Sequence, residues 1–141
     1  MTIAATAGVG GKRVLRLARE WTGGGVVAAA LIRRVAVIVT PVERVRDRLE
    51  CEDLAFPNDM LLILDGAGTL HLVGMGGFWQ ARPRQTLRRW PAGTAAAVVG
   101  EGQGWFRPLT IIDGSGATRV AAPYVDPRQK EALALIERLT V

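Results

Sequence analysis

The second half of the chain alternates short apolar runs with glycine-containing turns, a pattern typical of antiparallel strands. The runs Met60–Asp65 and Thr69–Gly74 flank Asp65-Gly66-Ala67-Gly68 and predict a β-hairpin. Residues Leu61 to Leu64 are apolar at odd and even positions alike, whereas a strand with one solvated face alternates. We therefore expect this strand to be covered on both faces.

Five more strands are predicted downstream of the hairpin. Pro83 is expected to interrupt the first two, because proline cannot donate to a strand ladder. Turns at Pro91-Ala92-Gly93, around the GEGQG segment and at Asp113-Gly114-Ser115-Gly116 separate the others. The predicted strands are Phe78–Arg82, Gln85–Trp90, Thr94–Val99, Trp105–Asp113 and Ala117–Ala122.

The C-terminal residues predict an amphipathic helix. Asp126 suits the N-cap, Pro127 suits the first helical position, and Gln129 stands where a capping-box partner belongs. Antiparallel strands closed by such a helix indicate the α+β class, with a helix-covered sheet or an open barrel. A single apolar stripe is expected to face the core, formed by Ala132, Leu135, Ile136 and Leu139.

The N-terminal residues predict a basic helix. Residues 1–11 are small and glycine-rich and are expected to be flexible. Lys12 to Trp21 predicts a short helix that Gly23-Gly24-Gly25 ends. One side of this helix is apolar (Val14, Leu17, Ala18 and Trp21), and the rest is basic (Lys12, Arg13, Arg16 and Arg19).

The segment before Asn58 predicts a strand and a second helix. Val27 to Ile32 fits either a strand or a helix, and we favour a strand; Val35 to Val39 is β-branched and strand-like. Thr40-Pro41-Val42-Glu43 is a capping box that predicts a helix to about Cys51, followed by an acidic loop. No repeat or long linker divides the chain, so we expect one domain over 1–141, with 12–57 as its N-terminal part and 58–141 as strands and C-terminal helix.

Charge and composition suggest an anionic partner. The chain has 141 residues, is 49% apolar and carries a net charge of +5. Lys12 and Lys130 are its only lysines, and the other sixteen basic residues are arginines, which suit carboxylates, phosphates and aromatic faces. The alternative explanation is a GC-rich coding sequence, which indicates a bacterium of actinobacterial type.

The compartment expected from the sequence is the cytoplasm, with peripheral contact to a membrane as a variant. Cys51 is the sole cysteine, so no internal disulfide forms. The N-terminus lacks the charged start of a signal peptide. The most apolar stretch, residues 26–39, is too short to span a bilayer and contains Arg33 and Arg34.

The sequence offers little for catalysis, metal binding or a cofactor. His71, Ser115 and Cys51 are each the only residue of their type. Ser115 lies in a Gly-Ser-Gly turn, and one His with one Cys cannot form a structural zinc site. We interpret His71 as a partly buried strand residue, with a pH switch as the alternative. The glycine-rich GVGGKR segment lacks the spacing of a phosphate-binding loop. We expect a protein without enzymatic activity, metal or cofactor.

Residues 78–90 form the best candidate for a binding surface. Arginines alternate with aromatic residues there and no acidic residue intervenes, as on surfaces that bind anions, peptides or single-stranded nucleic acid. The alternative is a set of half-buried aromatics beneath solvated arginines. The candidate binding residues are Trp79, Arg82, Arg84, Arg88, Arg89 and Trp90, and the basic helix 12–21 is a second candidate patch.

Residues 58–141 resemble bacterial PH-like domains in the order of their elements. The resemblance is carried by the segments MLLILDGAGTLHLVGM, ARPRQTLRRWP, WFRPLTIIDGSGATRV and DPRQKEALALIERL. It implies a bent antiparallel sheet or open barrel capped by the C-terminal helix, and a role in binding or scaffolding. No residue here matches the phosphoinositide site of eukaryotic PH domains.

The function expected from the sequence is therefore a non-enzymatic PH-like interaction or scaffolding module that binds a protein or an anionic partner through the arginine and aromatic surface. Two alternatives stay open, a basic nucleic-acid-binding protein and an enzyme or small-ligand binder with a pocket in the barrel. Anionic lipid is a further candidate partner, contacted through the helix 12–21.

Overall fold

Seven antiparallel strands form one open sheet that a C-terminal helix closes. The computed structural model describes residues 8–34, 57–76, 82–101 and 105–140. The strand order is β4-β3-β2-β1-β7-β6-β5, which confirms the predicted α+β class. The elements are α2 (Lys12–Thr22), β1 (Val26–Arg33), β2 (Asp59–Asp65), β3 (Leu70–Gly76), β4 (Arg82–Trp90), β5 (Ala95–Val99), β6 (Phe106–Asp113), β7 (Gly116–Pro123) and α4 (Pro127–Leu139).

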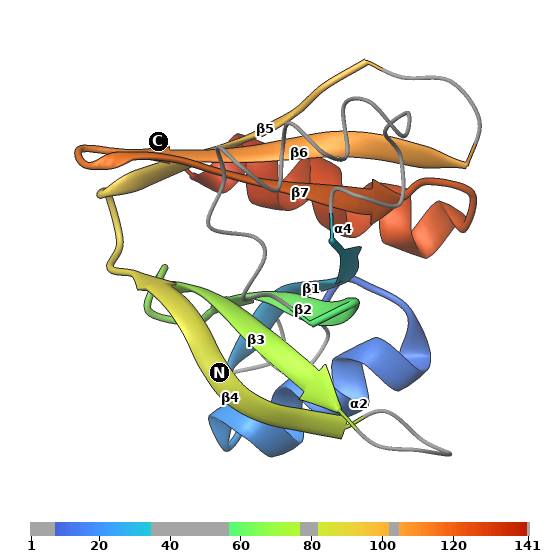
Figure 1. The fold of residues 1–141 in the computed structure, drawn as a ribbon. Helices are drawn as coiled ribbons and strands as arrows, with labels where there is room; N and C mark the ends of the chain where they lie inside the picture. The colour runs from blue at the N-terminus through green and yellow to red at the C-terminus, as the bar shows by residue number, and fades with distance from the viewer. Residues whose placement is uncertain (1–7, 35–56, 77–81, 102–104, 141) are drawn as a thin grey trace.

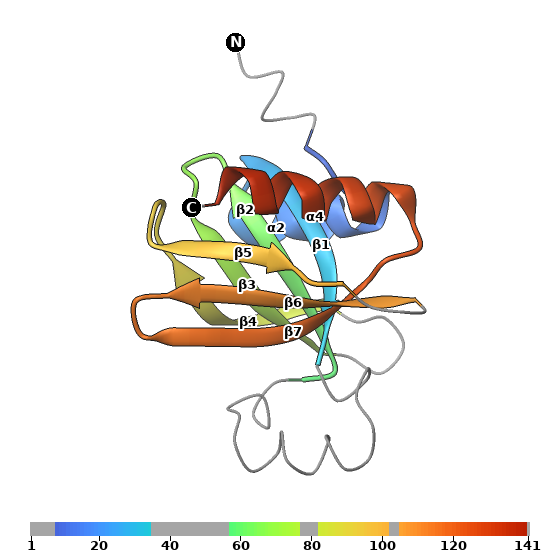
Figure 2. The ribbon, with the colours of Figure 1, turned by 90° about the horizontal axis from the view of Figure 1, so that it is seen from above.

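The sheet is bent into two layers around the main core. Strands β1 to β4 form one layer and β5 to β7 the other (Figure 1), and the strands of the two layers cross steeply (Figure 2). The layers join where Arg33 of β1 pairs with Ala121 of β7, and through the β4–β5 turn. The core between them includes Leu62, Leu72, Leu109, Ile111, Val120 and, from α4, Ala132, Leu133 and Ile136.

A second apolar cluster lies on the opposite face of β1, β2 and β3. The helix α2 covers this face with Leu15, Leu17 and Ala18. Leu61 and Ile63 of β2 belong to this cluster, whereas their neighbours on the same strand belong to the main core. The prediction that residues 61–64 are covered on both faces is therefore confirmed.

Three different parts of the chain complete the edge of β1 that faces away from β2. Near its start, Val9 donates to Val27 O (2.8 Å) and accepts from Ala29 N (3.0 Å). In its middle, Gln129 of α4 accepts from Leu31 N (3.0 Å) and donates to Leu31 O (2.7 Å). Its end pairs with β7. A glutamine amide carries one donor and one acceptor in the geometry of a peptide group, so Gln129 replaces a neighbouring strand at this position.

The structure corrects two predictions about α4. Gln129 is buried against β1 and does not act as a capping-box partner, although Asp126 does cap the helix by accepting from Arg128 N at 2.9 Å. Leu133 joins Ala132 and Ile136 in the buried stripe, and Leu135 is partly buried against the main core as predicted. Leu139 is left exposed.

The predicted break at Pro83 is wrong, because β4 runs through it as one strand. The strand lies at the edge of the sheet and pairs only with β3 among the described strands, so one of its edges needs no donor. Two register shifts, between Leu72 and Val73 and between Gly74 and Met75, absorb the irregularity.

The other predicted elements are found where the described residues include them. The helix from Lys12, the strand over 27–32, the opening hairpin and the later strands and turns are present within one or two residues of their predicted ends. In α2 the buried residues are Leu15, Leu17 and Ala18, and Trp21 is partly exposed. The strand 35–39, the helix 41–51 with Cys51 and the acidic loop, and residues 78–81 lie outside the described residues.

Candidate functional site

His71 takes part in holding the opening hairpin together. Its Nε2 lies 2.8 Å from Asp65 Oδ2, while Asp65 Oδ1 accepts from Ala67 N (2.9 Å) and Thr69 N (3.0 Å). Partial burial raises the pKa of Asp65, but the hydrogen bonds from His71, Thr69 and Ala67 outweigh it and hold the pKa below its usual value. The contacts of His71 are those of a strand residue that locks a turn.

Ser115 and Trp90 both bond to a second aspartate, Asp113. The Ser115 hydroxyl and backbone N each donate to Asp113 Oδ1 at 2.7 Å, and Trp90 Nε1 donates to Asp113 Oδ2 at 2.6 Å. The hydrogen bond from the Ser115 hydroxyl is the main cause that lowers the pKa of Asp113. Ser115 and His71 thus bond to different carboxylates. No group of three His, Cys, Asp or Glu side chains in the described chain is placed to hold a metal ion.

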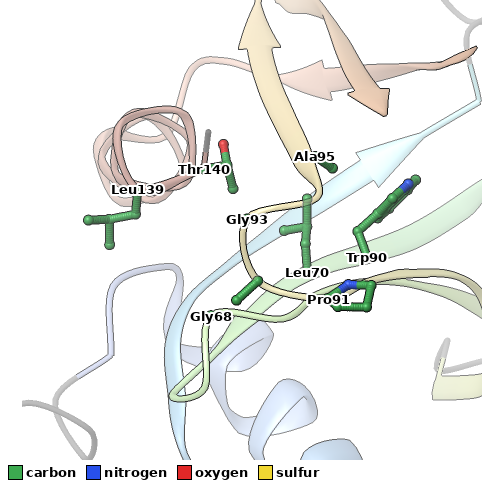
Figure 3. Close-up of a pocket in the computed structure, with 9 residues that line it drawn as sticks. Gly68, Leu70, Trp90, Pro91, Gly93, Ala95, Leu139 and Thr140 are labelled. Atoms are coloured by element: carbon green, nitrogen blue, oxygen red, sulfur yellow. The ribbon is translucent and has the colours of Figure 1, made fainter. Parts of the chain in front are cut away.

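A small pocket lies where the β2–β3 turn, the β4–β5 turn and the end of α4 meet (Figure 3). Its volume is about 70 Å³, and Leu70, Trp90, Ala95 and Leu139 supply much of its lining. The hydroxyl of Thr140 at its rim already donates to Ile136 O at 2.7 Å. Pockets for drug-sized ligands measure roughly 300 Å³ or more. This pocket therefore does not favour the small-ligand alternative.

The structure separates the arginines of the predicted binding surface from its aromatic residues. Trp90 is only 5% exposed and belongs to the main core, so it is not part of a surface. Trp79 lies outside the described residues. Of the four arginines on β4, Arg88 is half-buried, and the other three, Arg82, Arg84 and Arg89, are exposed. Within the described chain, the candidate surface on β4 is made of arginine.

The basic helix and the arginine strand lie beside each other. Helix α2 covers the outer face of the layer that β4 terminates, and it contacts β4 (Figure 1). Four cations and one acid, Glu20, stand on α2, and four arginines and no acid stand on β4, which gives these two elements a net charge of +7. The whole chain carries +5, so all its other residues together carry −2. We call the two neighbouring elements α2 and β4 together the basic face.

Sequence reasoning missed two features. The two basic patches are about seventy positions apart in the chain, and no local pattern indicates that they meet. A cation–π arrangement also forms where β6, the end of β7 and α4 meet, since Arg107 and Lys130 each lie 5.2 Å from the centre of the Tyr124 ring. The backbone N of Tyr124 donates to the carbonyl of Trp105 (2.7 Å), whose side chain is 75% exposed.

Neither α2 nor α4 has the length and apolar character of a membrane-crossing helix, and the same holds for every helix in the described residues. Comparison with known proteins gives no match, since no family model, curated protein or solved structure is significantly similar to this chain.

Proposed function

We propose that this chain is a non-enzymatic interaction module that binds an acidic partner on the basic face. The observation that carries the proposal is the separation of charge, because two adjacent elements hold more positive charge than the whole chain. Such a face attracts anionic groups and speeds their association. The internal hydrogen bonds of His71 and Ser115 and the small size of the pocket favour binding over catalysis.

The proposal includes a PH-like architecture for residues 58–141 together with β1, which precedes them in the chain. Its support is the order of the strands, in which two bent layers meet at β1 and β7, together with a C-terminal helix packed against the open side. The helix α2 precedes the segment that resembles PH-like domains. The basic face would therefore combine an added element with a strand of the barrel.

A charge-reversal experiment tests the basic face. Arg16, Arg84 and Arg89 are exposed and lie on its two elements, so the triple variant R16E/R84E/R89E reverses its charge without altering the core. We expect wild-type protein to bind a fluorescent polyglutamate peptide at low salt, and the variant to bind at least about tenfold more weakly, since each close like-charge contact costs affinity. Fluorescence anisotropy measures both.

The control variant is R128E/R138E, which changes two exposed arginines on α4, away from the basic face. Its affinity for the polyglutamate peptide should stay within about twofold of the wild-type affinity, apart from the general effect of the lower net charge. Equal weakening by both variants would mean that binding depends on net charge alone, and the basic face would be rejected. Tight, steeply salt-dependent binding of DNA or RNA in place of the peptide would favour the nucleic-acid alternative.

A further inference from the structure

The two outer strands of the sheet, β5 and β4, differ in whether other groups cap their backbone. At β5, the backbone N–H groups of Ala97 and Val99 donate to Thr140 Oγ1 (2.9 Å) and Glu137 Oε2 (2.7 Å), and α4 runs alongside the strand (Figure 2). At β1, Val9 and Gln129 complete the edge that β7 leaves open. At β4, no such cap is found among the described residues for the backbone of Gln85, Thr86, Leu87 or Arg89. A nine-residue edge strand of this kind is a template for one more strand.

We propose that β4 accepts an extended acidic segment of a partner protein as an additional strand of the sheet. This inference rests on the proposed function, and it names the partner and the way it binds. The charge of β4 identifies the partner, since four arginines and no acid call for glutamate or aspartate side chains. Arg84 and Arg89 are exposed to receive them. Within the described residues Arg84 directs only its Nε at a partner, Gly76 O (3.4 Å), so its terminal nitrogens can pair with a carboxylate.

The same arginines make β4 selective. Two copies of this strand placed edge to edge would bring eight arginines together, and this repulsion prevents the chain from pairing with itself. An acidic strand at the same edge is instead attracted by these arginines. Pro83 has no N–H, and therefore the ladder is confined to the stretch from Arg84 to Trp90.

Other partners fit this strand less well. Single-stranded nucleic acid is usually held by bases stacked on aromatic rings, but the ring of Trp90 is buried and bonded to Asp113. The pocket described above does not suit a lipid or sugar phosphate, because it is mostly lined by apolar and small residues and lies at the end of the strand. A peptide strand uses the exposed backbone edge as well as the charge.

The test compares two peptides of equal charge. One is a seven-residue acetylated peptide of alternating Glu and Thr, which matches the stretch of β4 from Arg84 to Trp90. The other has the same sequence with alternate backbone nitrogens methylated, which removes the donors along one edge and keeps every carboxylate. We expect the methylated peptide to bind at least about tenfold more weakly in fluorescence anisotropy, as the loss of one or two net hydrogen bonds predicts.

Amide hydrogen exchange of the full chain gives the second measurement. The unmodified peptide should slow exchange at Thr86 and Arg89, and it should do so in R128E/R138E but not in R84E/R89E. Equal affinity of the two peptides with no slowing in β4 would overturn strand addition while leaving the charge-based function intact. Failure of both peptides and of polyglutamate to bind would overturn both proposals. Binding of vesicles containing phosphatidylserine, or of single-stranded DNA, without peptide binding would also overturn both.

Discussion

Single polar residues in this protein mostly serve the fold. Asp65 accepts hydrogen bonds from a histidine and two backbone amides, and Asp113 accepts from a serine and a tryptophan. Each aspartate sits at the start of a glycine-containing turn, where a short carboxylate reaches backbone N–H groups two residues ahead. The residues that look reactive in the sequence, His71 and Ser115, are thus bound to the two aspartates that fix the turns.

The lowered pKa of Asp65 predicts a pH dependence of stability. Because the folded-state pKa lies below the unfolded value of 3.8, the unfolded chain binds the proton first as the pH falls. The stabilisation is therefore present above pH 3.8 and is lost as the pH falls through the folded-state pKa. We expect Asp65→Asn, which keeps an accepting oxygen, to show a flatter loss of unfolding free energy below about pH 5 than wild type. Urea unfolding at a series of pH values measures it. Parallel curves for the two proteins would contradict this role of Asp65.

At the scale of elements, the last turn of α4 protects one edge of the sheet. The helix packs on the core through Ala132, Leu133 and Ile136. It also brings Glu137 and Thr140 to backbone N–H groups on the outer edge of β5. These two side chains occupy the positions that a neighbouring strand would use.

The double variant E137A/T140A uncovers this edge. We expect it to lose about 1 to 2 kcal/mol of unfolding free energy, the net value of two hydrogen bonds, and to associate with itself at high concentration. Urea unfolding and sedimentation velocity measure the two effects. The control E131A/R138A changes exposed residues of the same helix that make no bond to β5. Association by the control as well would show that truncating exposed side chains of α4, and not uncovering the edge of β5, causes the self-association.

Local signals predict the elements well, and they fail where partners are distant in sequence. The first hairpin and the start of α4 have turn and capping residues within a few positions, so they could be placed correctly. Gln129 could not, because it looks like a capping residue and its true partner, Leu31, is 98 positions away. The arginines at 82–90 can be read from the sequence. The burial of Trp90 cannot, because the partner of its indole N–H, Asp113, lies in another strand.

At the scale of the whole molecule, one layer of strands is shared by two apolar clusters. Strands β1, β2 and β3 present one face to α4 and the other layer, and the opposite face to α2. The basic helix thereby packs on the same strands that position β4, and we expect the two elements of the basic face to keep their relative position.

Two neighbouring residues test whether the clusters unfold together. Leu61 faces α2 and Leu62 faces the main core, and both are fully buried. We expect Leu61→Ala and Leu62→Ala each to cost about 2 to 5 kcal/mol, with helix signal and tryptophan fluorescence lost in one coincident transition. Urea unfolding followed by circular dichroism and fluorescence measures it. An early, separate loss of helix signal in Leu61→Ala alone would mean that α2 detaches independently, and the basic face would not be a fixed surface.

The glutamine that completes β1 also makes this strand depend on residues that are synthesised much later. A ribosome releases β1 long before it has made Gln129, so the growing chain carries a half-finished strand through most of its synthesis. A chain that stops ahead of Gln129 lacks the side chain that bonds the backbone of Leu31, so this part of the β1 edge stays without that partner.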